Sequence, residues 1–147
     1  MIAFFNWFGK LHRRVYQLNG SVGRRFAWIP CLVLTTTGRK TGQRRDSVLV
    51  YADDPVDRST CVVVASNGGA DRPPAWLLNL QADPAVHVQV GNDRYDATAR
   101  VVTPDDADYV RLWKLVNSIN GNRYDGYQSK TTRPIAMVAL ARPGPTP

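Results

Sequence analysis

A short basic segment offers the clearest chemistry in the chain. The range 38–42 begins and ends with glycine, holds Arg39, Lys40 and Thr41, and is soon followed by Arg45. Glycine permits a tight turn, and guanidinium, ammonium and hydroxyl groups are donors that bind phosphate or carboxylate. The segment therefore predicts an anion-binding turn of a β-hairpin. The alternative is an ordinary hairpin tip whose charges are only solvated.

Other catalytic signatures are missing from the sequence. It has no GxGxxG and no GxxxxGK(S/T) motif, so neither a Rossmann site nor a P-loop is predicted. Ser66 lies in VASNG, which lacks the first glycine of a nucleophile elbow. Cys31 and Cys61 lie far apart, form no CxxC pair and are accompanied by only 2 histidines. We therefore predict two buried free thiols and no metal site.

The composition is that of one basic globular domain. The chain has 147 residues, of which 44% are hydrophobic and 21% are charged, and its formal net charge is +7. This length suits one compact core, and the charge predicts an anionic partner such as nucleic acid, a membrane surface or an acidic small molecule. We expect an N-terminal helix and linker over 1–29, a single domain over 30–142 and a flexible tail over 143–147.

The N-terminal segment has the pattern of an amphipathic helix. Apolar Phe4, Phe8, Leu11 and Val15 recur at helical spacing, with lysine and arginine between them. No apolar run reaches about 18 residues and no signal peptide is recognised, so we expect a cytoplasmic protein. The helix is expected either to pack on the domain or to contact the inner face of the plasma membrane.

After Pro30 the pattern changes to short strands separated by turns. The predicted strands are 32–37, 46–51, 60–66, 86–90, 95–102 and 134–140, of which 86–90 and 95–102 form a hairpin. One short helix is expected over 74–83, and a longer helix is expected from a cap at Thr103 to about residue 119. Six mostly antiparallel strands with flanking helices predict an α+β fold with a small closed sheet, rather than a doubly wound fold.

Four short motifs in a fixed order resemble those of the deazaflavin-dependent nitroreductase family. They are GRKTGQ-x-R on the first hairpin, ASxGG after the third strand, PxW-x-LN-L-xAxP on the short helix and YxxYQ-x-x-x-x-R near the carboxyl end. The resemblance covers about 30–140. It implies a split β-barrel that takes hydride from the reduced deazaflavin coenzyme F420. A related split barrel could bind FMN or heme instead.

The resemblance also implies a site with three parts. The residues implied to bind the phosphodiester and polyglutamate tail of the coenzyme are Arg39, Lys40, Thr41 and Arg45. The residues implied to bound the deazaflavin ring are Val48, Leu49, Val50, Ala65, Ser66, Asn67, Ala75 and Trp76. Those implied to face the acceptor, as proton donors or positioning groups, are Ser66, Tyr124 and Tyr127. Trp76 could instead be a core anchor, and the two tyrosines could instead cap the barrel mouth.

Several positions depart from the nitroimidazole-activating members of that family. Val50, Asn67 and Gly121 stand where those members carry a tyrosine, a lysine and a further tyrosine, and Val48 stands where proline is usual. With these departures, the resemblance implies hydride transfer to a quinone, an enone or an unsaturated lactone, and it disfavours nitro compounds.

Two functions of other kinds stay open on the sequence alone. A small basic barrel could bind nucleic acid by stacking bases on aromatic side chains beside a positive groove, but the segment 38–45 contains no aromatic residue. We therefore expect a small-molecule electron acceptor as the partner and no nucleic acid. A carrier that binds the coenzyme without turnover is the second alternative. The sequence is compatible with an oligomer but marks no interface.

Overall fold

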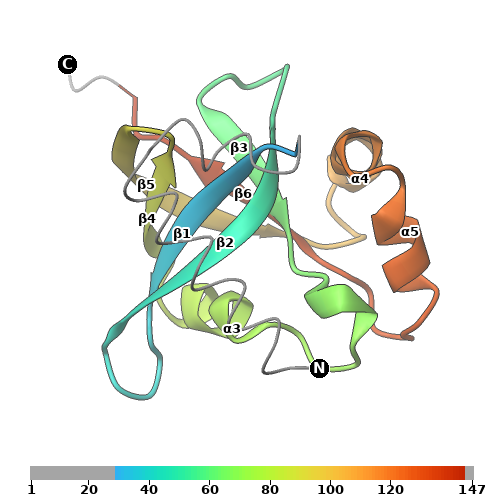
Figure 1. Cartoon of the computed structure of the whole chain (residues 1–147), viewed down its shortest axis with the longest axis horizontal. Coiled ribbons are helices and arrows are strands. Elements are labelled where there is room, and N and C mark those ends of the chain that lie inside the picture. Colours follow the sequence, from blue (N-terminus) through green and yellow to red (C-terminus); the bar gives the residue numbers. More distant parts are fainter. Residues whose placement is uncertain (1–28, 145–147) are drawn as a thin grey trace.

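A closed barrel of antiparallel strands forms the centre of the protein (Figure 1). The structure is a computed structural model that describes residues 29–144. The strands are β1 (Cys31–Thr37), β2 (Arg44–Asp53), β3 (Thr60–Val64), β4 (Ala85–Val90), β5 (Asp93–Val102) and β6 (Met137–Ala141). They follow one another around the barrel in the order β1-β2-β3-β6-β5-β4, and β1 pairs with β4 to close it. The predicted α+β split-barrel class is therefore confirmed.

The helices lie at one end and along one side of the barrel (Figure 1). They are the 3-10 helix η2 (Asn67–Gly69) and the α-helices α3 (Ala75–Ala82), α4 (Tyr109–Ile119) and α5 (Arg123–Gln128). Helix α3 closes the lower end of the barrel as drawn, α4 and α5 lie beside it, and η2 lies between α3 and α5. None of the helices in the described part of the chain is long and apolar enough to cross a bilayer.

The barrel interior is the first of two hydrophobic clusters. Its strand residues alternate along the chain because successive side chains of a strand point to opposite faces. The interior includes Leu32, Leu34, Val63, Val86, Val88, Ala97, Ala99, Val138 and Leu140, together with Trp76, Leu77 and Leu80 from α3. Each fully buried leucine or valine contributes about 1.5–3 kcal/mol, so the barrel and α3 form one stable unit.

The second cluster lies outside the barrel, beneath α4 and α5. Its members are Ala52, Val62, Val64, Val102, Leu112, Val116, Tyr124, Ile135, Met137 and Ala139. Strands β3 and β6 contribute to both clusters and are therefore covered on both faces, which explains why their sequences TCVVV and MVALA are almost continuously apolar.

The predicted hairpin between β4 and β5 is confirmed. Val90 pairs with Asp93, so only Gly91 and Asn92 form the turn, and Gly91 has a φ of +62°. Two-residue turns with positive φ match the twist of the flanking strands, which is why a glycine beside an asparagine is a strong hairpin signal.

The predicted helix start at Thr103 is wrong, because α4 begins at Tyr109. The Thr103 hydroxyl hydrogen-bonds the carboxylate of Asp105 instead of capping a helix. The backbone N–H of Asp106 donates to the carbonyl of Thr103 at 2.8 Å, and the N–H of Tyr109 donates to the carbonyl of Asp106 at 3.1 Å, so the segment forms successive turns. The carboxylate of Asp106 is in turn bound by Arg100 from β5. Side-chain bonds therefore compete successfully with the helix here.

Smaller differences concern the ends of elements. Strand β2 extends beyond the predicted 46–51, β3 ends at Val64 and β6 begins at Met137. Helix α5 was not predicted within the polar segment 120–130. The predicted N-terminal amphipathic helix lies outside the described residues. Cys31 and Cys61 are free and buried, as predicted.

Candidate functional site

The basic segment forms a tight loop between β1 and β2, as the sequence predicts. The N–H of Gly38 donates to the carbonyl of Gln43 at 2.7 Å, and the N–H of Gly42 donates to the carbonyl of Gly38 at 2.8 Å. Gly42 has a φ of +71°, and a Cβ on Gly38 would lie 3.0 Å from the carbonyl oxygen of Gln43. The local geometry therefore favours glycine at both positions.

Arg39 is held in place by an asparagine of α3. Asn79 accepts a hydrogen bond from Arg39 Nη1 at 3.1 Å and another from the Arg39 backbone N–H at 3.2 Å. Its amide nitrogen donates to the Thr36 hydroxyl at 3.2 Å, and the Asn79 side chain is buried. Asn79 thus fixes the loop to α3 while the remaining donors of the Arg39 guanidinium stay available to a ligand.

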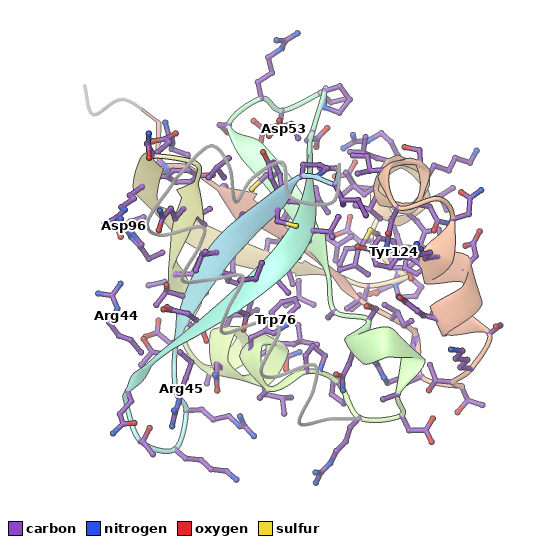
Figure 2. All side chains as sticks on the ribbon, in the orientation of Figure 1. Arg44, Arg45, Asp53, Trp76, Asp96 and Tyr124 are labelled. Atoms are coloured by element: carbon purple, nitrogen blue, oxygen red, sulfur yellow. The ribbon has the colours of Figure 1, made fainter. Side chains whose placement is uncertain are left out.

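The other predicted tail-binding residues surround the same loop. Lys40 and Thr41 are exposed at the loop tip, and the Thr41 hydroxyl accepts a hydrogen bond from the N–H of Gln43 at 3.3 Å. Arg45 folds back over the loop, since its Nε lies 3.7 Å from the position of a Cβ on Gly38. Figure 2 shows Arg44 and Arg45 near the base of the hairpin. Neighbouring strand residues face opposite sides of the sheet, so Arg45 rather than Arg44 joins the loop cations.

Residues 66–69 form the second element of the site, a glycine loop. Asn67, Gly68 and Gly69 all have positive φ, at 45°, 64° and 82°. The Asn67 amide donates to the carbonyl of Arg72 at 2.9 Å. Ser66 is half-buried at the N-cap of η2 and makes no side-chain cap hydrogen bond. Its hydroxyl is therefore available to a ligand.

The glycine loop packs directly on α5. A Cβ on Gly69 would lie 2.6 Å from the carbonyl oxygen of Tyr127, a distance that real Cβ atoms do not reach. Tyr127 itself is half-buried, and Lys130 lies over its ring at 5.7 Å from the centroid. The predicted Ser66 and Tyr127 therefore belong to two elements that are in contact.

Tyr124 lies deeper than Tyr127. It is 5% exposed, in the cluster beneath α4 and α5, and Figure 2 shows it between the barrel and these helices. Its ring meets that of Tyr127 edge-on at 6.1 Å and that of Trp113 at 6.3 Å. Burial raises the pKa of the Tyr124 phenol to about 12, so this group is neutral at ordinary pH.

Two side chains of the late motif have structural partners that sequence reasoning did not assign. The Arg133 guanidinium donates to the carbonyls of Ala70 at 2.8 Å, Ser66 at 2.9 Å and Ala65 at 3.3 Å. Gln128 donates to the carbonyl of Arg133 at 2.8 Å and accepts from the N–H of Ile135 at 2.8 Å. In the sequence, only the late motif indicated that Gln128 and Arg133 are important, because their hydrogen-bond partners come close to them only when the chain folds.

The remaining predicted ring-binding residues lie on β2 and α3. Val48, Leu49 and Val50 are all half-buried, and the Leu49 side chain packs against the barrel core. Ala75 is exposed at the first position of α3, and Trp76 is 8% exposed within the interior cluster. Trp76 thus packs in the core, and only the small exposed part of its side chain is accessible to the deazaflavin ring.

A separate cavity of about 510 Å³ lies on the outer face of β1, β2, β4 and β5. Its lining residues are Val33, Thr35, Arg44, Asp46, His87, Gln89 and Arg94. None of these is a predicted site residue, and the cavity includes neither the glycine loop nor α5. The predicted site is instead built from the hairpin loop, α3 and the glycine loop, which follow one another along the same end of the barrel (Figure 1).

The closed antiparallel barrel with a cationic hairpin loop and a glycine loop at one end places the chain in the class of small split-barrel proteins. Comparison with known proteins narrows this class. The family model for the F420H(2)-dependent quinone reductase matches residues 7–142, and the chain belongs to this family. It is therefore an F420H2-dependent reductase, which confirms the resemblance found in the sequence.

Individual relatives agree with the family. The chain is 47% identical over 135 residues to the F420H(2)-dependent quinone reductase Rv1261c of Mycobacterium tuberculosis, a match that covers 90% of this chain and 89% of the relative. The solved structure of the F420-H2 dependent reductase FDR-A is 33% identical with a TM-score of 0.66, covering 76% of this chain and 93% of that one. A solved domain-swapped dimer is 29% identical with a TM-score of 0.69, covering 92% and 98%.

Proposed function

We propose that this protein transfers hydride from coenzyme F420H2 to quinones, and that enones and unsaturated lactones are further acceptors of the same electronic type. The observation that supports this most is the placement of two different binding elements at one end of the barrel. A cationic loop is fixed on α3, and a glycine loop packs on Tyr127. These elements suit the anionic tail and the planar ring of one coenzyme. A 47% identical relative is named as a quinone reductase.

The hairpin loop would bind the tail. Arg39, Lys40 and Arg45 bring three cations together, and Thr41 adds a hydroxyl donor. Guanidinium groups bind phosphate and carboxylate through paired, directional hydrogen bonds. Because Asn79 already orders Arg39, less side-chain entropy is lost when a ligand binds.

The ring would lie between β2 and the glycine loop. Residues 48–50 of β2 would border the ring mainly through their backbone, because the side chains of Val48 and Val50 lie on the strand face of Arg44 and not on that of Arg45. Ala65, Ser66 and Asn67 provide backbone and side-chain groups for the ring edge, and Ala75 and Trp76 close the side at α3. When bound, F420H2 supplies hydride from its reduced ring. The protein's contribution is to orient that ring, to hold the acceptor against it and to exclude water.

The acceptor would lie on the side of α5. Reduction of a quinone to a hydroquinone consumes one hydride and one proton, so a proton donor is required beside the acceptor. Tyr127 and Ser66 are the groups placed at the contact of the glycine loop with α5. Tyr124 supports the Tyr127 ring edge-on, and its buried phenol stays protonated. Solvent is the alternative source of the proton.

A parallel titration with oxidised F420, FMN and NADPH at low and high salt tests the coenzyme assignment. We expect F420 alone to bind, more weakly at high salt because the tail contacts are ionic. Oxidation of F420H2 is then followed by absorbance with a soluble menaquinone analogue, an enone and a nitroimidazole. Binding without acceptor-dependent oxidation would indicate a carrier, and fast turnover of the nitroimidazole alone would overturn the proposed acceptor class.

A matched pair of charge reversals tests the hairpin. Lys40→Glu should raise the dissociation constant of F420 about tenfold or more, because a charge-assisted hydrogen bond contributes about 1.5–3 kcal/mol. Arg58→Glu makes a similar charge change at an exposed position in the turn between β2 and β3, so it should leave the constant nearly unchanged. Equal effects of the two variants would mean that only net charge matters and that the loop is not the binding site.

A further inference from the structure

The segment after α5 and the glycine loop are joined by one guanidinium. Arg133 uses Nε, Nη1 and Nη2 to bind three carbonyls, those of Ala70, Ala65 and Ser66. These carbonyls lie at both ends of the loop, so Arg133 spans it. A lysine has one nitrogen at its tip and cannot reproduce this planar fork.

Arg133 is itself anchored to the end of α5. Its carbonyl accepts a hydrogen bond from Gln128 Nε2 at 2.8 Å, and its N–H donates to the Thr131 hydroxyl at 3.3 Å. The Thr131 hydroxyl also donates to the carboxylate of Asp71, beyond the glycine loop, at 2.8 Å. The chain segment that carries Arg133 is therefore tied to α5 on one side and to the loop on the other.

The contact between Gly69 and Tyr127 leaves no room for a side chain at position 69. Gly69 approaches the Tyr127 backbone so closely that a Cβ would lie 2.6 Å from its carbonyl oxygen. The loop also has three successive residues with positive φ, and Asn67 is the one among them that is not glycine and adopts this conformation at a cost. Burial disfavours the charged guanidinium of Arg133 and lowers its pKa. Its hydrogen bonds to three carbonyls offset this cost of burial.

We propose that Arg133 is a positioning residue for hydride transfer: it sets the distance between the glycine loop, which bounds the deazaflavin ring, and Tyr127, which faces the acceptor. This inference rests on the proposed function, because it assigns the ring to the loop and the acceptor to α5. In this proposal Arg133 contacts neither reactant directly. Its effect passes through the carbonyls of Ala65, Ser66 and Ala70, and it is independent of the hairpin that binds the tail.

The test compares Arg133→Lys with Arg123→Lys, which changes an exposed arginine at the start of α5 in the same way. Dissociation constants are measured for F420 and for its deazaflavin ring without the phosphodiester tail. Arg133→Lys should weaken binding of the tail-free ring about tenfold and leave the ratio of the two constants unchanged, whereas Lys40→Glu should change that ratio. Single-turnover hydride transfer should slow in Arg133→Lys beyond the loss explained by binding.

Chemical rescue and hydrogen exchange separate positioning from mere stability. Added guanidinium should restore ring binding to Arg133→Ala at a concentration that does not change the wild-type protein. Amide exchange in residues 67–70, measured without coenzyme, should accelerate in Arg133→Lys and not in Arg123→Lys. Lower thermal stability with unchanged ring binding, hydride transfer and loop exchange would overturn the proposal.

The same measurements distinguish an error in the proposed function from an error in the positioning role of Arg133. If the wild-type protein binds neither F420 nor its ring, the function is wrong and the positioning role in hydride transfer falls with it. Amide exchange then still decides whether Arg133 holds the loop. If the wild type binds and turns over and Arg133→Lys matches Arg123→Lys in every measurement, the function stands and the positioning role alone is refuted.

Discussion

Replacing Gly69 by alanine should break the contact between the glycine loop and α5. Gly69 has a φ of +82°, and an alanine Cβ would lie 2.6 Å from the carbonyl oxygen and 3.0 Å from the Cα of Tyr127. A left-handed conformation costs an L-residue about 1–2 kcal/mol, and forcing a methyl group into packed structure costs about 1–3 kcal/mol more. We therefore expect Gly69→Ala to lower the free energy of unfolding by about 2–5 kcal/mol.

The preceding glycine provides a matched control. Gly68 has a φ of +64°, and no atom lies within 4 Å of its ideal Cβ. Gly68→Ala should therefore cost only about 1–2 kcal/mol, the price of the backbone conformation. Urea unfolding of both variants, followed by circular dichroism and by tryptophan fluorescence, gives the two free energies under the same extrapolation.

The difference between the two variants isolates the packing of the loop on Tyr127. Equal destabilisation by Gly68→Ala and Gly69→Ala would show that the loop is not pressed against α5, and it would remove the main support for placing ring and acceptor at this contact. A larger loss in Gly69→Ala should be accompanied by slower hydride transfer, because the loop must move away from α5 to make room.

Three further outcomes are expected. Asn79→Ala should lower the free energy of unfolding by about 1–3 kcal/mol, since it leaves the buried Thr36 hydroxyl without its donor, and should weaken F420 binding because Arg39 loses its anchor; unchanged binding in a fluorescence titration would contradict the role given to Asn79. Tyr127→Phe should lower single-turnover quinone reduction about 100-fold if its phenol donates the proton, whereas the buried Tyr124→Phe should change it little; equal rates for Tyr127→Phe and wild type would leave solvent as the donor. The Arg111 guanidinium holds the pKa of Asp54 below its usual value, so the stability that Asp54 contributes is present above about pH 4 and is lost as the pH falls through its folded pKa. Asp54→Asn should accordingly have a lower free energy of unfolding than wild type at pH 7. This difference in free energy, measured by unfolding at a series of pH values, should narrow towards pH 2. A difference that does not change with pH would show that the ion pair of Asp54 with Arg111 does not contribute to stability.

Local signals in the sequence predicted the barrel well. The turn glycine Gly91 and the alternating residues around it specified the β4–β5 hairpin, because turn type and register depend on neighbours in the chain. The basic loop was equally predictable from the sequence, since glycines mark both of its ends. The family motifs then supplied the coenzyme, which no periodic pattern could have specified.

Contacts across the fold explain what the sequence analysis missed. Thr103 and the acidic residues after it look like a helix start, but Arg100 on the neighbouring strand binds their carboxylates and keeps them in turns. Helix α5 is only 6 residues long and follows Asn122 in a left-handed conformation, so it lacks a helical period. The roles of Asn79 and Arg133 depend on partners about 40 and 67 residues away, which spacing alone does not reveal.

The position of β6 in the barrel has a consequence for synthesis. β6 lies between β3 and β5, and Ala141 pairs with both Thr60 and Thr98. Until residues 137–141 have left the ribosome, β3 and β5 are open edges, and an apolar strand already made has no neighbour on that side. The barrel therefore closes only after translation of its last strand, and from residue 102 to residue 141 the nascent chain can form at most an open sheet with β3 and β5 at its edges.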